Sequence, residues 1–181
     1  MRSSYKKNEY GELFTALTNI YRPKLAVELG VLDGYSLIAM AKGGAGKVVG
    51  VDLFGEYKFK HGRMPEIYAE AKKNDVSIEL IHQSAFDAPS QFNDKSIDFF
   101  HVDISNTGDS LREVFDVWNC KLSDQCVIIF EGGSLERDQV EWMKKHNKTT
   151  VNRFKQQLKR SNRYEFFTFT PFPSLTICRK V

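Results

Sequence analysis

The chain has 181 residues, of which 41% are hydrophobic and 27% charged, and 26 basic against 23 acidic side chains give a formal net charge of +3. This near-average composition excludes a disordered, collagen-like or membrane-embedded chain, and no apolar run approaches the roughly 20 residues of a membrane helix. The first residues contain no apolar signal region, and the three cysteines lack the spacing of a zinc cluster or a disulfide framework. We therefore expect a cytoplasmic protein without a membrane partner.

The predicted elements alternate between helices and strands. Apolar residues at helical spacing predict a first helix over residues 8–21, which Pro23 ends. Apolar runs then predict buried strands, and amphipathic stretches between them predict helices. The strands are expected at 24–30, 47–54, 77–83, 96–103 and 125–133, and the helices at 34–42, 65–74 and 108–119. Residues 135–160 are helical in part, and residues 163–179 have the aromatic and β-branched content of a hairpin.

Strands that alternate with helices over short connections indicate a parallel sheet wrapped by helices. We predict one α/β domain over residues 1–181, with an N-terminal helix within 1–22 and an α/β core over 23–181. The core is expected to be a Rossmann-like, doubly wound sheet of mostly parallel strands, with helices on both faces and a C-terminal antiparallel hairpin. Ligands of such sheets bind outside the carboxyl ends of the strands, so candidate residues are sought there.

The end of the first predicted strand combines a carboxylate with two glycines. Glu28 and Gly30 lie at this end, and Gly34 follows four residues after Gly30. Glycines let the backbone turn tightly and approach a ligand without a Cβ in the way. The spacing is not the G-x-G-x-x-G of dinucleotide binders, but Asp52 ends the second strand, where a carboxylate can accept hydrogen bonds from a ribose.

This pattern resembles the cofactor loop of class I S-adenosylmethionine-dependent methyltransferases, and the terminal hairpin mirrors the last two strands of that family. The resemblance implies a set of residues that bind S-adenosylmethionine. The amino-acid end of the cofactor would be held by Glu28 and the Gly30–Gly34 loop, followed by Tyr35 and Ser36; Asp52 would bind the ribose; Leu53, Ser84, Ala85 and Phe86 would flank and cover the adenine. Ser36 could instead cap the helix that begins near Gly34, which is the commoner role for such a residue.

Three further residues are candidates for catalysis, because transfer of a methyl group to a hydroxyl requires a group that takes or weakens its proton. Asp103 and Glu131 end the fourth and fifth strands and are expected at one mouth, and His101 precedes Asp103. Two carboxylates can bind Mg²⁺, and hydroxyl-methylating family members often have further acidic residues there, but this chain has Ser105 and Gly132 instead. His101 is a candidate general base, although its apolar neighbours also suit a buried, hydrogen-bonded histidine.

The sequence thus predicts an S-adenosylmethionine-dependent methyltransferase that O-methylates a small polar acceptor, such as a sugar or related metabolite. Two alternatives remain: a module that binds the cofactor without catalysis, and a nucleotide-dependent oxidoreductase on a similar sheet. Nucleic acid is a less suitable partner, because HVDISN (residues 101–106) stands where amino-methylating enzymes have an aromatic N/D-P-P motif. The loop over residues 54–64, with Tyr57 and Phe59, suits a lid or an ordinary exposed loop.

The small net charge conceals an asymmetry. Residues 1–120 have a net charge of −3 and residues 121–181 of +6, most of it between Arg137 and Arg163. If this basic segment borders the mouth, it favours an anionic acceptor; the other interpretation is a solvated helix face. A homodimer is expected only by analogy with other small proteins of this fold.

Overall fold

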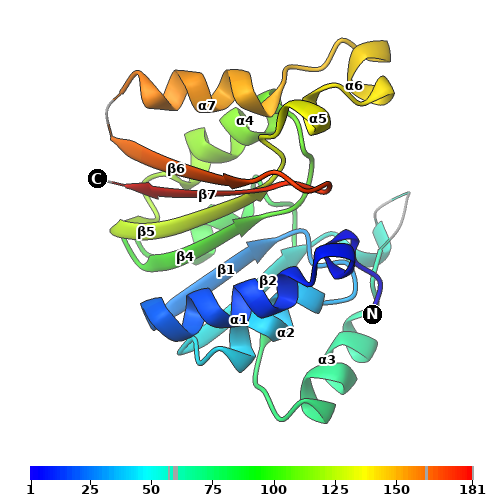
Figure 1. Cartoon of the computed structure of the whole chain (residues 1–181). Helices are drawn as coiled ribbons and strands as arrows, with labels where there is room; N and C mark the ends of the chain where they lie inside the picture. Colours follow the sequence, from blue (N-terminus) through cyan, green and yellow to red (C-terminus); the bar gives the residue numbers. More distant parts are fainter. Residues whose placement is uncertain (57, 59–60, 162, 181) are drawn as a thin grey trace.

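The computed structural model describes residues 1–56, 58, 61–161 and 163–180. Five parallel strands alternate with helices, and an antiparallel pair follows (Figure 1). The strands are β1 (Leu25–Leu29), β2 (Lys47–Asp52), β3 (Glu79–His82), β4 (Ile97–Val102), β5 (Leu122–Glu131), β6 (Tyr164–Phe169) and β7 (Leu175–Lys180). The helices are α1 (Tyr10–Tyr21), α2 (Tyr35–Lys42), α3 (Met64–Lys73), α4 (Gly108–Trp118), α5 (Leu135–Asp138), α6 (Glu141–Lys145) and α7 (Val151–Lys159), with 3₁₀ turns η1 (Ser4–Asn8), η2 (Phe54–Glu56) and η3 (Ala88–Gln91).

The strand order in the sheet is β3-β2-β1-β4-β5-β7-β6. The order reverses between β1 and β4, which places a switch point there, and β7 lies antiparallel between β5 and β6. The predicted fold class, a mostly parallel Rossmann-like sheet with a C-terminal antiparallel hairpin, is confirmed. The predicted element positions agree to within a few residues; the largest difference among the parallel strands is β5, which begins three residues early.

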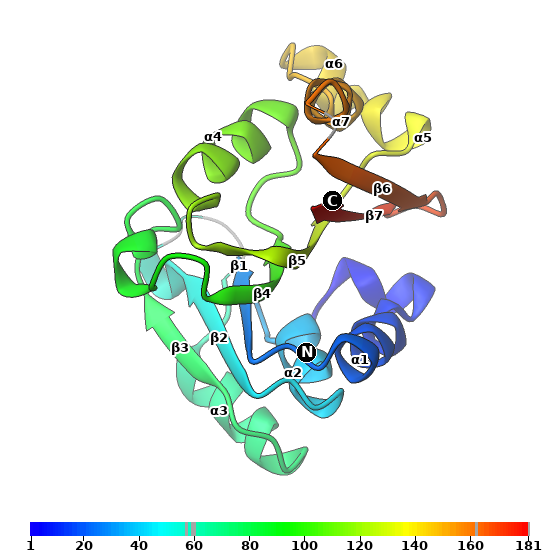
Figure 2. The same ribbon diagram turned by 90° about the vertical axis from the view of Figure 1, so that its left-hand side faces the viewer.

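Helices cover both faces of the sheet, with α1, α2 and α3 on one face and α4 and α7 on the other (Figures 1 and 2). Each face has its own core. Phe14 of α1, Met40 of α2 and Ile67 of α3 are buried in one, and Trp118 of α4 and Phe154 of α7 in the other. Successive residues of a strand project to opposite faces, so buried strands covered on both faces are apolar throughout.

Strand register brings the candidate residues to one edge. Leu29 pairs with Val51 and Val102, and Val102 pairs with Phe130. The residues that end these strands or directly follow them are Gly30, Asp52, Asp103 and Glu131, and they therefore emerge side by side. In the part of the chain that the structure describes, no helix is long and apolar enough to cross a membrane.

Candidate functional site

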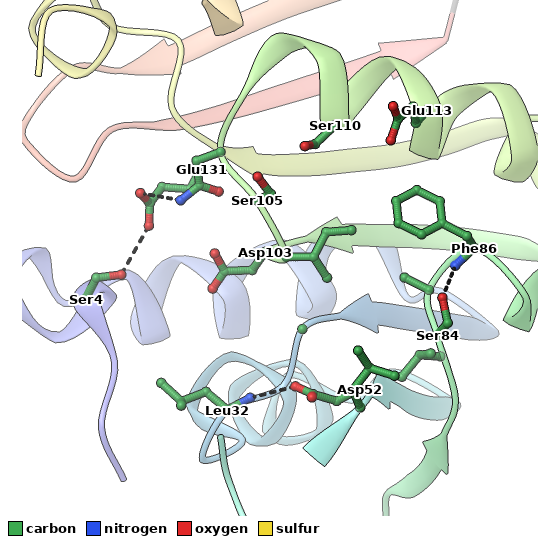
Figure 3. Close-up of a pocket in the computed structure, with 16 residues that line it drawn as sticks. Ser4, Leu32, Asp52, Ser84, Phe86, Asp103, Ser105, Ser110, Glu113 and Glu131 are labelled. Carbon is green, nitrogen blue, oxygen red and sulfur yellow. Dashed lines mark hydrogen bonds between the residues drawn. The ribbon is translucent and has the colours of Figure 1, made fainter. Parts of the chain in front are cut away.

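A cavity of about 640 Å³ opens at this edge of the sheet (Figure 3). Its volume falls within the range of small-molecule and cofactor sites. Its described walls come from η1, the ends of β1, β2, β4 and β5, the loop after β3, and α4: Ser4, Gly30, Leu32, Val51, Asp52, Leu53, Ser84, Ala85, Phe86, Asp103, Ile104, Ser105, Asn106, Ser110, Glu113 and Glu131. The cavity thus has an apolar section at Leu53, Phe86 and Ile104 and an acidic section at Asp103 and Glu131.

Asp52 fixes the loop that forms one wall. Its Oδ2 accepts hydrogen bonds from the N–H groups of Val31 (2.6 Å) and Leu32 (3.2 Å), and its Oδ1 accepts one from the N–H of Phe54 (2.8 Å). A carboxylate has about four acceptor positions, so one remains for a ligand hydroxyl. Asp52 therefore both anchors the loop and faces the cavity.

Gly30 is required by backbone packing. It has φ +85°, and a Cβ at this position would overlap the carbonyl oxygen of Asp103. A side chain would therefore push apart the ends of β1 and β4. The absence of a side chain also keeps this wall of the cavity open.

The cavity includes six of the ten residues that the resemblance assigned to cofactor binding: Gly30, Asp52, Leu53, Ser84, Ala85 and Phe86. The other four, Glu28, Gly34, Tyr35 and Ser36, do not line it. A Cβ at Gly34 would approach Ile67 of α3 to 2.8 Å, and Tyr35 lies against Gly11 of α1. Ser36 does not cap α2; its hydroxyl donates to Oε1 of Glu28. The described structure thus gives these four residues contacts within the fold.

Glu28, His101 and Tyr5 form a buried hydrogen-bonded chain behind the cavity. The side chains of Glu28 and His101 are fully buried, their strands pair at these residues, and Nδ1 of His101 lies 2.7 Å from Oε1 of Glu28. Nε2 of His101 lies 3.1 Å from the Tyr5 hydroxyl, which also hydrogen-bonds with Asp103. His101 is therefore separated from the cavity, and the expectation that it acts directly as the base is not supported by its position.

Tyr5 connects this chain to the cavity. Its hydroxyl has one proton, so it donates to only one of its two partners, His101 or Asp103, at a time. Burial raises the pKa of Tyr5 well above its usual value, and the nearby carboxylates of Asp103, Glu131 and Glu28 act in the same direction. Tyr5 therefore stays protonated at neutral pH.

Asp103 and Glu131 form the acidic section, on the side of the cavity toward Ser4 (Figure 3). Burial raises the pKa of Asp103 well above that of an exposed aspartic acid, and Glu131 and Glu28 raise it further. Glu131 is held by three donors: Asn106 Nδ2 at 2.7 Å, Ser4 Oγ at 3.2 Å and Arg137 Nε at 3.4 Å. The two acids thus differ in their surroundings: Glu131 accepts hydrogen bonds from three donors, whereas burial and neighbouring carboxylates raise the affinity of Asp103 for a proton.

The donor set at Asp103 and Glu131 does not suit a resident Mg²⁺. Both oxygens of Glu131 already accept hydrogen bonds, and Nε of Arg137 is one of the donors, so neither oxygen is free to coordinate a metal ion. Within the described ranges, no group of three or more His, Cys, Asp or Glu side chains is arranged to hold a metal ion. Mg²⁺ binds through carboxylate oxygens that are free to coordinate it, and those of Glu131 are occupied by hydrogen-bond donors.

Several cavity residues were not among the sequence candidates, notably Ser4, Asn106, Ser110 and Glu113. Asn106 directly follows the fourth strand's HVDIS run and could have been found by extending the strand-end rule. Ser4 contacts Glu131 across 127 positions of sequence, and no motif around it signals that contact. Of the expected lid, Tyr57 and Phe59 lie outside the described residues.

Comparison with known families decides the assignment. The family described as "Methyltransferase domain" matches residues 27–131, more than half of the chain, from within β1 to the end of β5. The chain belongs to this methyltransferase family. The matched segment of the methyltransferase includes every cavity residue listed above except Ser4.

Solved structures have the same fold as this methyltransferase. The O-methyltransferase from Bacillus cereus, in complex with SAH, is 17% identical over 96% of this chain and 81% of that one, with a TM-score of 0.67. PaMTH1 from Podospora anserina, bound to SAH, is 18% identical over 100% and 80%, with a TM-score of 0.69. TomG from Streptomyces achromogenes, an O-methyltransferase in complex with SAM, is 15% identical over 98% and 85%, with a TM-score of 0.69. No curated protein matches the chain in sequence.

Proposed function

We propose that the protein is an S-adenosylmethionine-dependent O-methyltransferase that acts on a small polar acceptor. The observation that carries the proposal is that Asp52 and Asp103 line the same cavity. Nearly all of the residues that line it lie in the segment matched by a methyltransferase family. Three structural neighbours, described as bound to SAM or to its product SAH, support the choice of cofactor. When bound, S-adenosylmethionine supplies an already activated methyl group.

The cavity residues suit the two halves of this cofactor. Asp52 has an acceptor position for a ribose hydroxyl, and Leu53, Ala85 and Phe86 offer an apolar surface to the adenine. The loop that carries Ala85 is held in place by Trp118, whose indole N–H donates to the Ala85 carbonyl at 2.8 Å. The methionine end would then lie along Gly30 and Leu32, toward the acidic section.

Asp103 is the proposed general base. A base works best when its pKa lies near the operating pH, and both burial and Glu131 shift the pKa of Asp103 upward in that direction. Asp103 would take the proton of the acceptor hydroxyl as the new oxygen–carbon bond forms. Ser4 and Asn106, which hold Glu131, supply polar groups at the same end. No step uses Mg²⁺, so we expect a chelator to leave turnover unchanged.

Phe86 offers a direct test of cofactor binding. Its side chain lines the cavity yet is 42% exposed, so its removal should cost little stability. Stacking of an aromatic side chain on a base contributes roughly 1–3 kcal/mol, so Phe86→Ala should weaken binding of S-adenosylmethionine by about fivefold or more in calorimetry. Phe167→Ala, on β6 and also exposed, is the matched control and should bind like the unmodified protein.

The same titration separates the alternatives. Binding of a nicotinamide cofactor in place of S-adenosylmethionine would favour the oxidoreductase and contradict the proposal. If S-adenosylmethionine binds, Asp103→Asn should retain binding but lose methyl transfer to a panel of hydroxyl acceptors. If Asp103→Asn turns over as fast as the unmodified protein, Asp103 is not the general base.

A further inference from the structure

The ionisable residues that line the described part of the cavity are all acidic: Asp52, Asp103, Glu113 and Glu131. Asp52 is occupied with the loop after β1, and Glu113 lies on α4, on the Phe86 side of the cavity (Figure 3). Asp103 and Glu131 lie together at the opposite side, close to Ser4. The negative charge is therefore concentrated at the end where, under the proposed function, the methyl group and the acceptor meet.

The fold forces these two carboxyl groups together. Val102 of β4 pairs with Phe130 of β5, so the next residue of each strand projects into the same mouth. Glu28 lies behind the pair, and Tyr5 contacts Asp103. Among the residues that the structure describes, Arg137 of α5 forms an ion pair with Glu131; its side chain is only 12% exposed and does not line the cavity.

The basic segment does not reverse this charge. Lys155 of α7 lies near the end of β5, but its ammonium donates to the Gly133 carbonyl (3.2 Å) and to Thr168 Oγ1 (2.7 Å). No residue of 137–163 is among the described residues that line the cavity. The excess positive charge of the C-terminal third thus lies on α5, α6 and α7, outside the walls.

We propose that Asp103 and Glu131 form a charge-selective subsite that favours a cationic group at the point of methyl transfer and rejects an anionic one. The acceptor is then an uncharged or cationic hydroxyl compound, and not the phosphorylated or carboxylated acceptor that the basic segment suggested. The physical reason is that like charges brought together at a desolvated site repel strongly, whereas opposite charges attract. This inference rests on the proposed function, because that function places the cofactor's sulfur at this end.

Two ligands that differ in charge at this point test the subsite. Sinefungin carries an ammonium group where S-adenosylmethionine has its methylated sulfur, whereas S-adenosylhomocysteine has a neutral sulfur there. Calorimetry at pH 8 should show sinefungin binding about tenfold more tightly than S-adenosylhomocysteine, and Glu131→Gln and Asp103→Asn should each reduce that preference severalfold. Glu136→Gln, an exposed glutamate of α5 outside the described lining, should leave it unchanged.

The unmodified protein provides a second measurement that does not depend on a variant folding. Lowering the pH from 8 to 5 favours the protonated, neutral form of Asp103, whose pKa is raised by burial, so the preference for sinefungin should shrink. Equal affinity for the two ligands at pH 8, or an undiminished preference in both variants, would overturn the inference while leaving the cofactor assignment intact. Binding of neither ligand would instead contradict the proposed function.

An acceptor pair extends the test to substrates. A polyol and the same polyol carrying a phosphate are compared by the formation of S-adenosylhomocysteine. The uncharged polyol should be methylated faster than its phosphate. Glu131→Gln should reduce the ratio of the two rates. Faster methylation of the phosphorylated partner would contradict the charge-selective subsite.

Discussion

The burial of Asp103, the proposed general base, has a cost in stability. Burial beside Glu131 and Glu28 raises its pKa, which means that the folded protein binds the Asp103 proton more tightly than the unfolded chain does. As the pH rises from the unfolded pKa toward the folded one, the folded state loses that advantage and its free energy of unfolding falls. The same raised pKa suits a general base.

Asp103→Asn should therefore stabilise the protein, and increasingly so as the pH rises from about 4 to 8. Each unit by which the pKa of Asp103 in the folded state exceeds its pKa in the unfolded chain changes the free energy of unfolding by about 1.4 kcal/mol. Chemical denaturation at several pH values measures the effect, with the exposed Asp116→Asn as the control. If the stability gained by Asp103→Asn over the unmodified protein shrinks as the pH rises, then the ionised form of Asp103 does not destabilise the fold.

Glu28 and His101 are candidate site residues that do not line the described cavity. Both lie inside strands, β1 and β4, whereas Gly30 and Asp103 directly follow them. A residue within a strand projects to a face of the sheet, and a residue beyond its end can reach the cavity. The strands predicted at 24–30 and 96–103 already contain Glu28 and His101, so the strand bounds are not the cause: Glu28 was a candidate because of the family resemblance, and His101 because of the chemistry of its imidazole.

Among the elements, the turn after β1 depends most on one residue. Gly30 and Gly44 both have positive φ angles, +85° and +88°, but they differ in their surroundings. A Cβ at Gly30 would overlap the Asp103 carbonyl oxygen, whereas a Cβ at Gly44 would have no neighbour among the described atoms within 4 Å. Alanine substitutions at these two glycines therefore distinguish the cost of a positive φ angle from the cost of a steric clash.

Gly44→Ala should cost roughly 1–2 kcal/mol of unfolding free energy, since only the left-handed conformation is penalised. Gly30→Ala should cost a further 1–3 kcal/mol or so, because β1 and β4 must also move apart. Denaturant titrations of the two variants give the comparison. Equal losses would mean that the ends of β1 and β4 adapt without cost.

The first segment of the chain was the least predictable element. Tyr5 is fully buried and Ser4 lines the cavity, yet the sequence analysis placed the first element at residue 8. Apolar runs predict the five parallel strands, and apolar residues at helical spacing predict the helices between them. The segment SYKKN (residues 4–8) has neither, and its hydrogen bonds to Glu131 and His101 span 127 and 96 positions of sequence.

At the scale of the whole molecule, the cavity joins elements from residue 4 to residue 131. A ligand that binds only the folded protein stabilises it by about 2.7 kcal/mol at a concentration of 100 Kd. For a chain of this length, that should raise the Tm by roughly 5–10 °C in the presence of S-adenosylmethionine. Differential scanning fluorimetry checks the shift, and an equal shift with Phe86→Ala would argue against the proposed adenine contact.

The position of β7 has a consequence for how the chain is made. β7 follows β6 in sequence, yet it lies between β5 and β6 in the sheet (Figure 1). Until the ribosome has synthesised residues 175–180, the edge of β5 along Val127, Ile128 and Ile129 has no partner strand, and β6 cannot join the sheet. An unpaired apolar edge is a template for association with other chains. A nascent or truncated chain that ends before β7 should therefore aggregate, although every cavity residue described here has already been synthesised.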